Sequence, residues 1–174
     1  AVEMIRQLKI AHDSAVTDRS AAMVTMKAML VHGSDELRRE TSRKSQIMLA
    51  RHLAALRPRT LASPDDALRH SLRSLARRWQ QLDAEAKELS SMIAQLVVDT
   101  APQLLEQFGI GVDTAAEILI VVGDNPERIR SEAAFAKLAG ISPVPTGSGM
   151  TSGRHRVNHG AVSYTHLTLP TILL

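Results

Sequence analysis

The chain of 174 residues contains no cysteine and only four aromatic residues. Without cysteine it has no disulfide scaffold, no cysteine-ligated zinc finger and no thiol nucleophile. Four aromatic side chains are too few for a platform on which RNA bases stack. No apolar run approaches the roughly 18 residues of a membrane span, and no signal peptide opens the chain. We therefore expect a soluble, cytoplasmic protein with no membrane partner.

Acidic residues are missing from the last part of the chain. The last one is Glu132, whereas Lys137, Arg154 and Arg156 follow it together with three histidines. A segment whose only formal charges are positive favours an anionic partner, although a solvated basic edge would have the same composition.

Helical patterns dominate the sequence. Apolar residues recur every three or four positions over 1–32, and the same spacing predicts helices over 42–56, over 115–122 and from Ser131 onwards. Ser34, followed by two acidic residues, predicts the cap of a short helix. We predict an all-α fold, with an irregular, basic loop over 141–160 because no strand pattern is evident there.

The clearest element is a long helix over 63–101. It begins with a serine cap, a proline at the first helical position and two acidic residues. Its apolar positions form a heptad seam at Leu68, Leu72, Leu75, Trp79, Leu82, Ala86, Leu89, Ile93 and Leu96. This spacing is typical of a coiled coil. Periodicity leaves open whether the partner is a second chain, which would make a homo-oligomer, or the helices upstream.

We divide the chain into four segments. They are a helical segment over 1–62, the coiled-coil helix over 63–101, a C-terminal domain over 102–161 and a tail over 162–174. The first residue already lies within a helical pattern, so we expect the sequence to start inside a longer gene product. The tail resembles a translated sequencing adapter, and we expect a disordered artefact there, which is excluded from the site.

A short apolar segment, a Gly-x-Gly turn and an apolar helix follow the long helix. This order predicts a helix-hairpin-helix, whose glycines let backbone N–H groups approach a nucleic-acid phosphate. The residues expected to make that contact are Gly109, Gly111 and Thr114. A simple turn between two helices is the alternative, because a single Gly-x-Gly is a common pattern.

Ser148 is the candidate nucleophile. It stands between Gly147 and Gly149, a few residues before Arg154 and Arg156. A serine that attacks a DNA phosphate needs freedom in the backbone around it and guanidinium groups to hold the phosphate oxygens. Composition by itself describes a flexible glycine and serine loop equally well, so both interpretations stay open at this point.

No metal site is predicted. His155 and His159 are four residues apart, but no carboxylate lies near them and the local glycines argue against a helix. Contact with phosphate or solvent is therefore expected for both. The acidic residues between Asp65 and Glu127 stand at helix caps, in turns or on the charged side of the long helix, so we interpret them as structural.

Several separated motifs occur together in one order. They lie at 109–116, 123–128, 130–136, 140–145, 148–149 and 154–158, with a further one at 72–79. In this order they resemble the C-terminal domain and the connecting coiled coil of the IS110/IS116 insertion-sequence transposases. The resemblance spans about residues 1–160.

The resemblance implies a function. Family members join an acidic, RuvC-like DEDD domain to a coiled coil and this C-terminal domain, and catalyse DNA transposition or recombination, in some cases directed by a bridge RNA. Ser148 matches the serine that becomes covalently linked to DNA. The further nucleic-acid contacts that we expect in this domain are Gly147, Gly149, Arg154, His155, Arg156 and Asn158.

Departures from the family pattern limit what this chain is expected to do. Mg²⁺ is expected in the DEDD domain, which this sequence lacks, and no cofactor is expected here. The family pattern would also continue after Gly160. We therefore expect no strand exchange from the chain alone. Two alternatives remain: a non-catalytic DNA-binding module carried on a coiled-coil dimer, and a purely structural oligomerisation module.

Overall fold

Helices form nearly all of the regular structure that is described. The computed structural model describes residues 1–57, 60–123, 127, 129–138, 142, 144–145 and 155–156. Contacts divide the chain into two compact units, Ala1–Val121 and Val122–Leu174. The predicted all-α class is confirmed. Among the described helices, none has the length and apolar character that crossing a bilayer requires.

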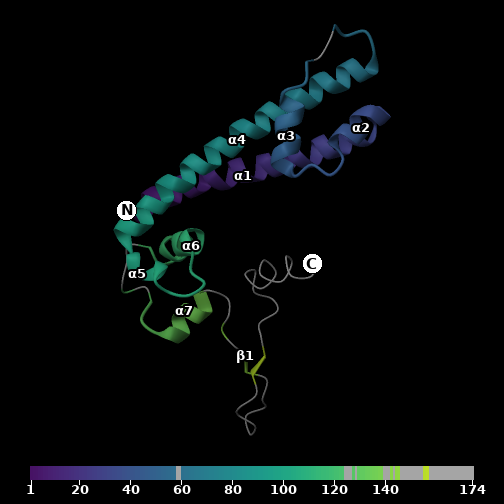
Figure 1. Ribbon diagram of the computed structural model, residues 1–174. Coiled ribbons are helices and arrows are strands. Elements are labelled where there is room, and N and C mark those ends of the chain that lie inside the picture. The colour runs from purple at the N-terminus through teal and green to yellow at the C-terminus, as the bar shows by residue number, and fades with distance from the viewer. Residues whose placement is uncertain are drawn as a thin grey trace. The chain divides into compact units, whose positions relative to one another are not determined.

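Two long antiparallel helices form the frame of the first unit. They are α1 (Val2–Val31) and α4 (Pro64–Thr100), and Figure 1 shows them side by side. Ile5, near the start of α1, packs with Ile93 near the end of α4. Met26, near the end of α1, packs with Leu72 near the start of α4. The chain therefore runs up one helix and back along the other.

Local signals set where the helices begin. The hydroxyl of Ser63 accepts a hydrogen bond from the backbone N–H of Asp66 at 3.2 Å and donates to its carboxylate at 2.7 Å. The hydroxyl of Ser34 caps α2 (Asp35–Thr41) by accepting from the backbone N–H of Leu37 at 3.4 Å, so both predicted caps are confirmed. The helix α3 (Gln46–Ala54) begins later than the predicted residue 42. Its cap is Ser45, because Arg43 has a φ of 66° that a helix does not allow.

The seam of α4 meets α1 of the same chain. Leu72, Trp79, Ala86 and Ile93 are buried as the heptad predicted. The alternate predicted positions are only half-buried: Leu75, Leu82, Leu89 and Leu96. Ala76 and Val97, one residue further along, are buried instead. The seam of α4 therefore packs against the upstream helix α1, which is one of the two partners that periodicity left open. Other helices pack on the same side of α4, so the buried face is shifted by one residue at these positions.

Each end of the helix pair has its own apolar core. At one end α3 packs against α1 and α4 around Met26, Leu53 and Leu72. At the other end α5 (Pro102–Leu105) and α6 (Val112–Val122) pack around Ile5 and Val97. Burial of each such aliphatic side chain stabilises the fold by roughly 1.5–3 kcal/mol. Packing therefore groups α5 and α6 with the long helices, whereas the four predicted segments, which divide the sequence differently, stay a prediction.

The described residues of the second unit beyond α6 form one helix and a short ladder. α7 (Glu132–Leu138) begins after Ser131, whose hydroxyl accepts from the N–H of Ala134 at 3.2 Å. β1 (Val144–Pro145) pairs with β2 (His155–Arg156) in an antiparallel ladder. The sequence predicted an irregular loop there, and the ladder differs from that expectation. A two-residue strand is too short to show the alternation of side chains by which strands are identified.

Candidate nucleic-acid interface

A glycine turn joins α5 to α6. Gly109 has a φ of 85°, a region that side chains rarely adopt, and the next residue, Ile110, donates its N–H to the carbonyl of Gln107 at 3.1 Å. Gly111 accepts the first helical hydrogen bond of α6 from Ala115 at 2.9 Å. A methyl group added at either glycine would meet nothing within 4 Å. The turn is therefore fixed by its backbone and open to a partner on its outside.

Phe108 adds an apolar side chain to the same turn. Its relative exposure is 107%, the highest among the exposed large apolar residues. A fully solvated aromatic ring gains free energy when a partner covers it. The sequence analysis did not single out this residue, because spacing alone does not tell which ring of a turn packs inward.

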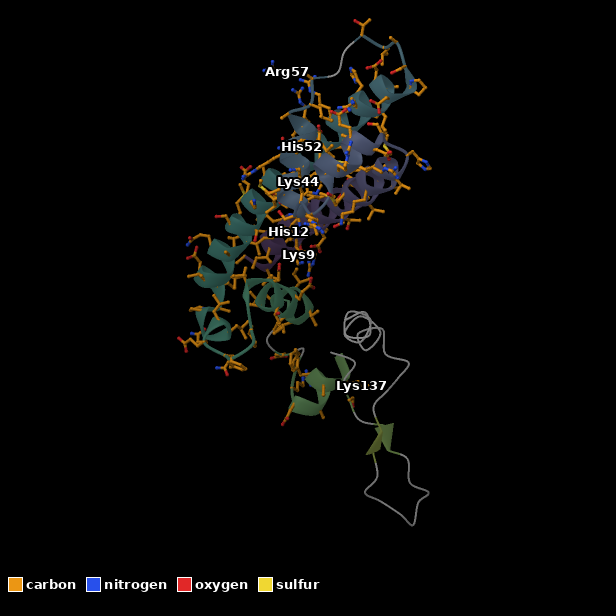
Figure 2. The ribbon with its side chains drawn as sticks, turned by 45° about the vertical axis from the view of Figure 1, so that its right-hand side comes forward. Lys9, His12, Lys44, His52, Arg57 and Lys137 are labelled. Carbon is orange, nitrogen blue, oxygen red and sulfur yellow. The ribbon has the colours of Figure 1, made fainter. Side chains whose placement is uncertain are left out.

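Lys9 connects the start of α6 to α1. Its ammonium nitrogen Nζ lies 2.8 Å from Oδ1 of Asp13, 3.4 Å from Oε1 of Glu117 and 3.8 Å from Oδ1 of Asp113. Burial by itself would lower the pKa of Lys9, but the carboxylates, with Asp13 first, outweigh burial and raise it. Figure 2 labels Lys9 on α1.

Arg6 makes a second connection, since its Nη2 donates to the carbonyl of Ile120 at 3.3 Å. The two α1 cations thus hold α6 along its length. They also leave the acidic Asp113 in the first turn of α6, where its charge opposes that of an approaching phosphate. Thr114, the third predicted contact of the turn, is exposed beside it.

The local order of helix, glycine turn and helix is present as predicted. The first helix, however, has only four residues. The arrangement fits both a small helix-hairpin-helix and a simple turn between helices, so its contact with DNA stays a prediction.

The catalytic candidate belongs to the second unit. Ser148, Gly147, Gly149, Arg154 and Asn158 lie outside the described residues, as does His159. His155 and Arg156 form β2, where Pro145 pairs with His155 and Val144 with Arg156. The ladder therefore joins the two ends of segment 146–154, which carries the serine, both flanking glycines and Arg154.

The described residues do not fit a metal site. Within the described part of the chain, no group of three or more histidine, aspartate or glutamate side chains could hold an ion.

Comparison with known protein families gives a match to the C-terminal part of the chain. Residues 101–170 match the family model described as Transposase IS116/IS110/IS902 family. The matched range contains the glycine turn, α6, α7 and both strands of the ladder. It runs nine residues into the tail that begins at 162, so it does not stop where the adapter-like sequence starts. No curated protein and no solved structure matches the chain.

Proposed function

We propose that this chain, whose residues 101–170 match the family model of the IS116/IS110/IS902 insertion-sequence transposases, binds DNA and supplies Ser148 as the nucleophile of strand cleavage and exchange. The observation that carries the proposal is the antiparallel pairing of β1 with β2. Pairing brings the strand of Arg156 beside the strand that leads into the serine segment.

Chain length limits how far the serine lies from this ladder. Ser148 follows Pro145 by three residues, which span at most about 11 Å. Pro145 is itself paired with His155. Arg156 is the next residue in that strand, and a guanidinium group reaches several ångströms beyond its Cα. Serine and arginine can therefore meet at one phosphate.

The reaction is a transesterification. Oγ of Ser148 forms a bond to phosphorus and loses its proton, while one bridging P–O bond breaks and the departing deoxyribose oxygen takes up a proton. Arg154 and Arg156 hold the non-bridging oxygens as negative charge develops on them. The bond between Ser148 and DNA is a phosphate ester, like the DNA bond that it replaces. A second DNA end can therefore displace the serine without an external energy source.

DNA contact extends beyond the reacting phosphate. Gly147 and Gly149 leave room for the backbone to approach, and His155 and Asn158 add hydrogen-bond donors on the phosphate path. On the first unit, the open turn at Gly109, Gly111 and Thr114 contributes a second contact to the sugar-phosphate backbone. We also propose a bridge RNA as a partner of the chain.

A second copy of the chain is the other partner. The half-buried leucines of α4 form one row at seven-residue spacing, Leu75, Leu82, Leu89 and Leu96. The row spans about 32 Å along the helix axis. A groove of about 650 Å³ continues it between α1 and α4, lined by Glu3, Met4, Gln7, Leu8, Met92, Gln95 and Leu96. We expect a dimer by light scattering that Leu82→Lys with Leu89→Lys dissociates; a dimer that survives both changes excludes this surface.

The nucleophile is tested by trapping covalent adducts. The chain is completed with an acidic domain of a relative, guide RNA and Mg²⁺, and given DNA with matching ends. We expect Ser148→Ala to abolish the protein–DNA adduct and leave DNA binding intact. Ser152→Ala is the matched control, since Ser152 lies in the same segment beside a glycine. Adducts that persist without Ser148 would favour the non-catalytic DNA-binding module.

A further inference from the structure

Charge is distributed unevenly along α4. Residues 67–82 contain four arginines and His70 but no acidic residue, whereas residues 83–121 contain seven acidic residues and one lysine. The first unit therefore has a basic end, where α2 and α3 pack, and an acidic end near α5 and α6. Figure 2 shows Lys44, His52 and Arg57 at the basic end as well.

Two of the four arginines in this stretch have partners. Nε of Arg69 donates to Oδ2 of Asp65 at 2.8 Å. Nη2 of Arg78 lies 3.8 Å from a carboxylate oxygen of Asp18, and both of these side chains are largely exposed. Such a long, solvated pair contributes little and leaves the arginine available to another anion.

Arg73 and Arg77 differ from them. Within the described part of the chain, neither makes an ion pair with a carboxylate. Nε of Arg73 is buried and has no hydrogen-bond partner there. The guanidinium group of Arg73 therefore has no carboxylate among the described residues to neutralise it, and its charge remains available to an anion that binds at the surface.

These cations surround one surface hollow. Its volume is about 420 Å³, and its lining residues are His70, Arg73, Ser74, Arg77, Arg78 and Gln81. All six side chains can donate hydrogen bonds and none is a carboxylate. A neighbouring hollow of about 400 Å³ includes Glu36, Asp65 and Asp66 in its lining. Only the first of these two hollows is therefore suited to an anion.

The spacing fits a polymer of phosphates. Arg73 and Arg77 are four residues apart, about 6 Å along the helix axis. The rise of about 3.4 Å per nucleotide is measured along the duplex axis, and the winding of the strand places successive phosphates further apart than this, so the two guanidinium groups can contact neighbouring phosphates. Gln81 extends the row of donors by another turn.

We propose that this hollow of α4, which we call the basic hollow, binds the phosphodiester backbone of a nucleic acid without reading its sequence. The basic hollow lies outside residues 101–170 and does not depend on Ser148 or on the ladder. Single-stranded regions, duplex DNA and folded RNA share the phosphodiester chemistry, so separate probes identify the natural partner.

The test measures fluorescence anisotropy of the full chain with a labelled duplex DNA and a labelled RNA hairpin at several salt concentrations. We expect Arg73→Gln with Arg77→Gln to weaken binding of at least one probe by roughly tenfold or more at 0.1 M salt. We also expect the slope of log K against log salt to become shallower by nearly 2, because each phosphate contact contributes about 0.9 to it.

A matched control removes the same charge elsewhere. Lys27→Gln with Arg51→Gln lowers the net charge equally, and both residues are exposed and lie outside the basic hollow. We expect it to change affinity by less than about twofold, and circular dichroism establishes that both variants stay helical. Unchanged binding in the Arg73 and Arg77 variant overturns the proposal. Equal losses in both variants also overturn it, since overall charge would then explain binding.

Two further measurements are needed. One tests the basic hollow independently of the proposed function, and the other tests whether an acidic polypeptide binds as well as a nucleic acid does. Arg154→Gln with Arg156→Gln tests the C-terminal contacts alone, so one surface can fail while the other holds. Polyglutamate added as a competitor tests for a general polyanion site. Competition by polyglutamate as strong as that by unlabelled nucleic acid, at equal charge, overturns recognition of the phosphodiester backbone.

Discussion

Arg19 and Asp83 join the two long helices close to their midpoints. Nη1 of Arg19 donates to Oδ1 of Asp83 at 2.6 Å, and the carboxylate also accepts from Nζ of Lys87 at 2.7 Å. The Asp83 side chain is 17% exposed. The pair lies between the two apolar cores, near the level at which Ala15 and Ala86 are buried. Few large apolar side chains pack between the two helices at this level, so the ion pair sets the register of the helices there.

Loss of this pair is expected to destabilise the protein. Asp83→Asn removes the charge and leaves Arg19 partly buried beside a neutral group, which we expect to lower the free energy of unfolding by about 1–2 kcal/mol. Urea unfolding followed by circular dichroism measures the change. Asp18→Asn is the control, because its pair with Arg78 is long and exposed and should contribute less than about 0.5 kcal/mol. Equal effects would contradict the role of Asp83.

The same carboxylate makes stability depend on acid. The hydrogen bond from Lys87, and with it Arg19, outweighs partial burial and lowers the pKa of Asp83 below its ordinary value of 3.8. A lowered pKa in the folded state means that the stabilisation is present above pH 3.8 and is lost as the pH falls through the folded-state value. We expect the difference in urea midpoint between wild type and Asp83→Asn to shrink below pH 3.8. A constant difference down to pH 2 would contradict this.

Lys9 is expected to control the mobility of α6. Lys9→Gln keeps most of the side chain but removes the charge that holds Asp113 and Glu117. We expect amide hydrogens of α6 to exchange several-fold faster, while those in the middle of α4 keep their protection. Hydrogen exchange with mass spectrometry resolves the two segments. Lys27→Gln, at an exposed position of α1, serves as the control. Equal exchange in both variants would show that apolar packing alone holds α6.

The two glycines of the turn are expected to respond differently to alanine. Gly109→Ala places a side chain at a φ of 85°, and we expect it to lower stability by roughly 1–2 kcal/mol. Gly111→Ala has an ordinary φ and open space, so its effect should stay within about 0.5 kcal/mol. Thermal unfolding compares the two variants. A cost at Gly111 equal to that at Gly109 would show that contacts, not backbone conformation, select these residues.

Local signals in the sequence predicted local structure well. The serine, proline and acidic residues before α4 fixed its start, because a cap depends on residues within one turn. Tertiary contacts were not accessible in the same way. Burial of Ala76 in place of Leu75 depends on which side α3 covers, and a heptad pattern is the same whichever helix covers it. The start of α3 at Gln46 likewise depends on a left-handed residue, Arg43.

Part of the candidate site could also be predicted from the sequence. The glycine turn could be predicted from its composition, and Gly109 does adopt the conformation that favours glycine. The ladder could not, because Val144 and Arg156 are twelve residues apart and a proline stands in one of its two-residue strands. The basic hollow was missed for another reason. Arginines flanking a coiled-coil seam look like solvated charges until the structure shows which of them lack carboxylate partners.

The straight course of α4 sets a fixed distance inside the first unit. From Arg77 to the end of the helix at Thr100 the axis extends about 35 Å. This length equals about one full turn of B-form DNA, or ten base pairs. A duplex lying parallel to α4 therefore presents the same face at both ends of this interval. If the basic hollow and the glycine turn bind one duplex as proposed, the helix pair sets the distance between the two contacts, and inserting or deleting one helical turn in both helices would move them out of phase.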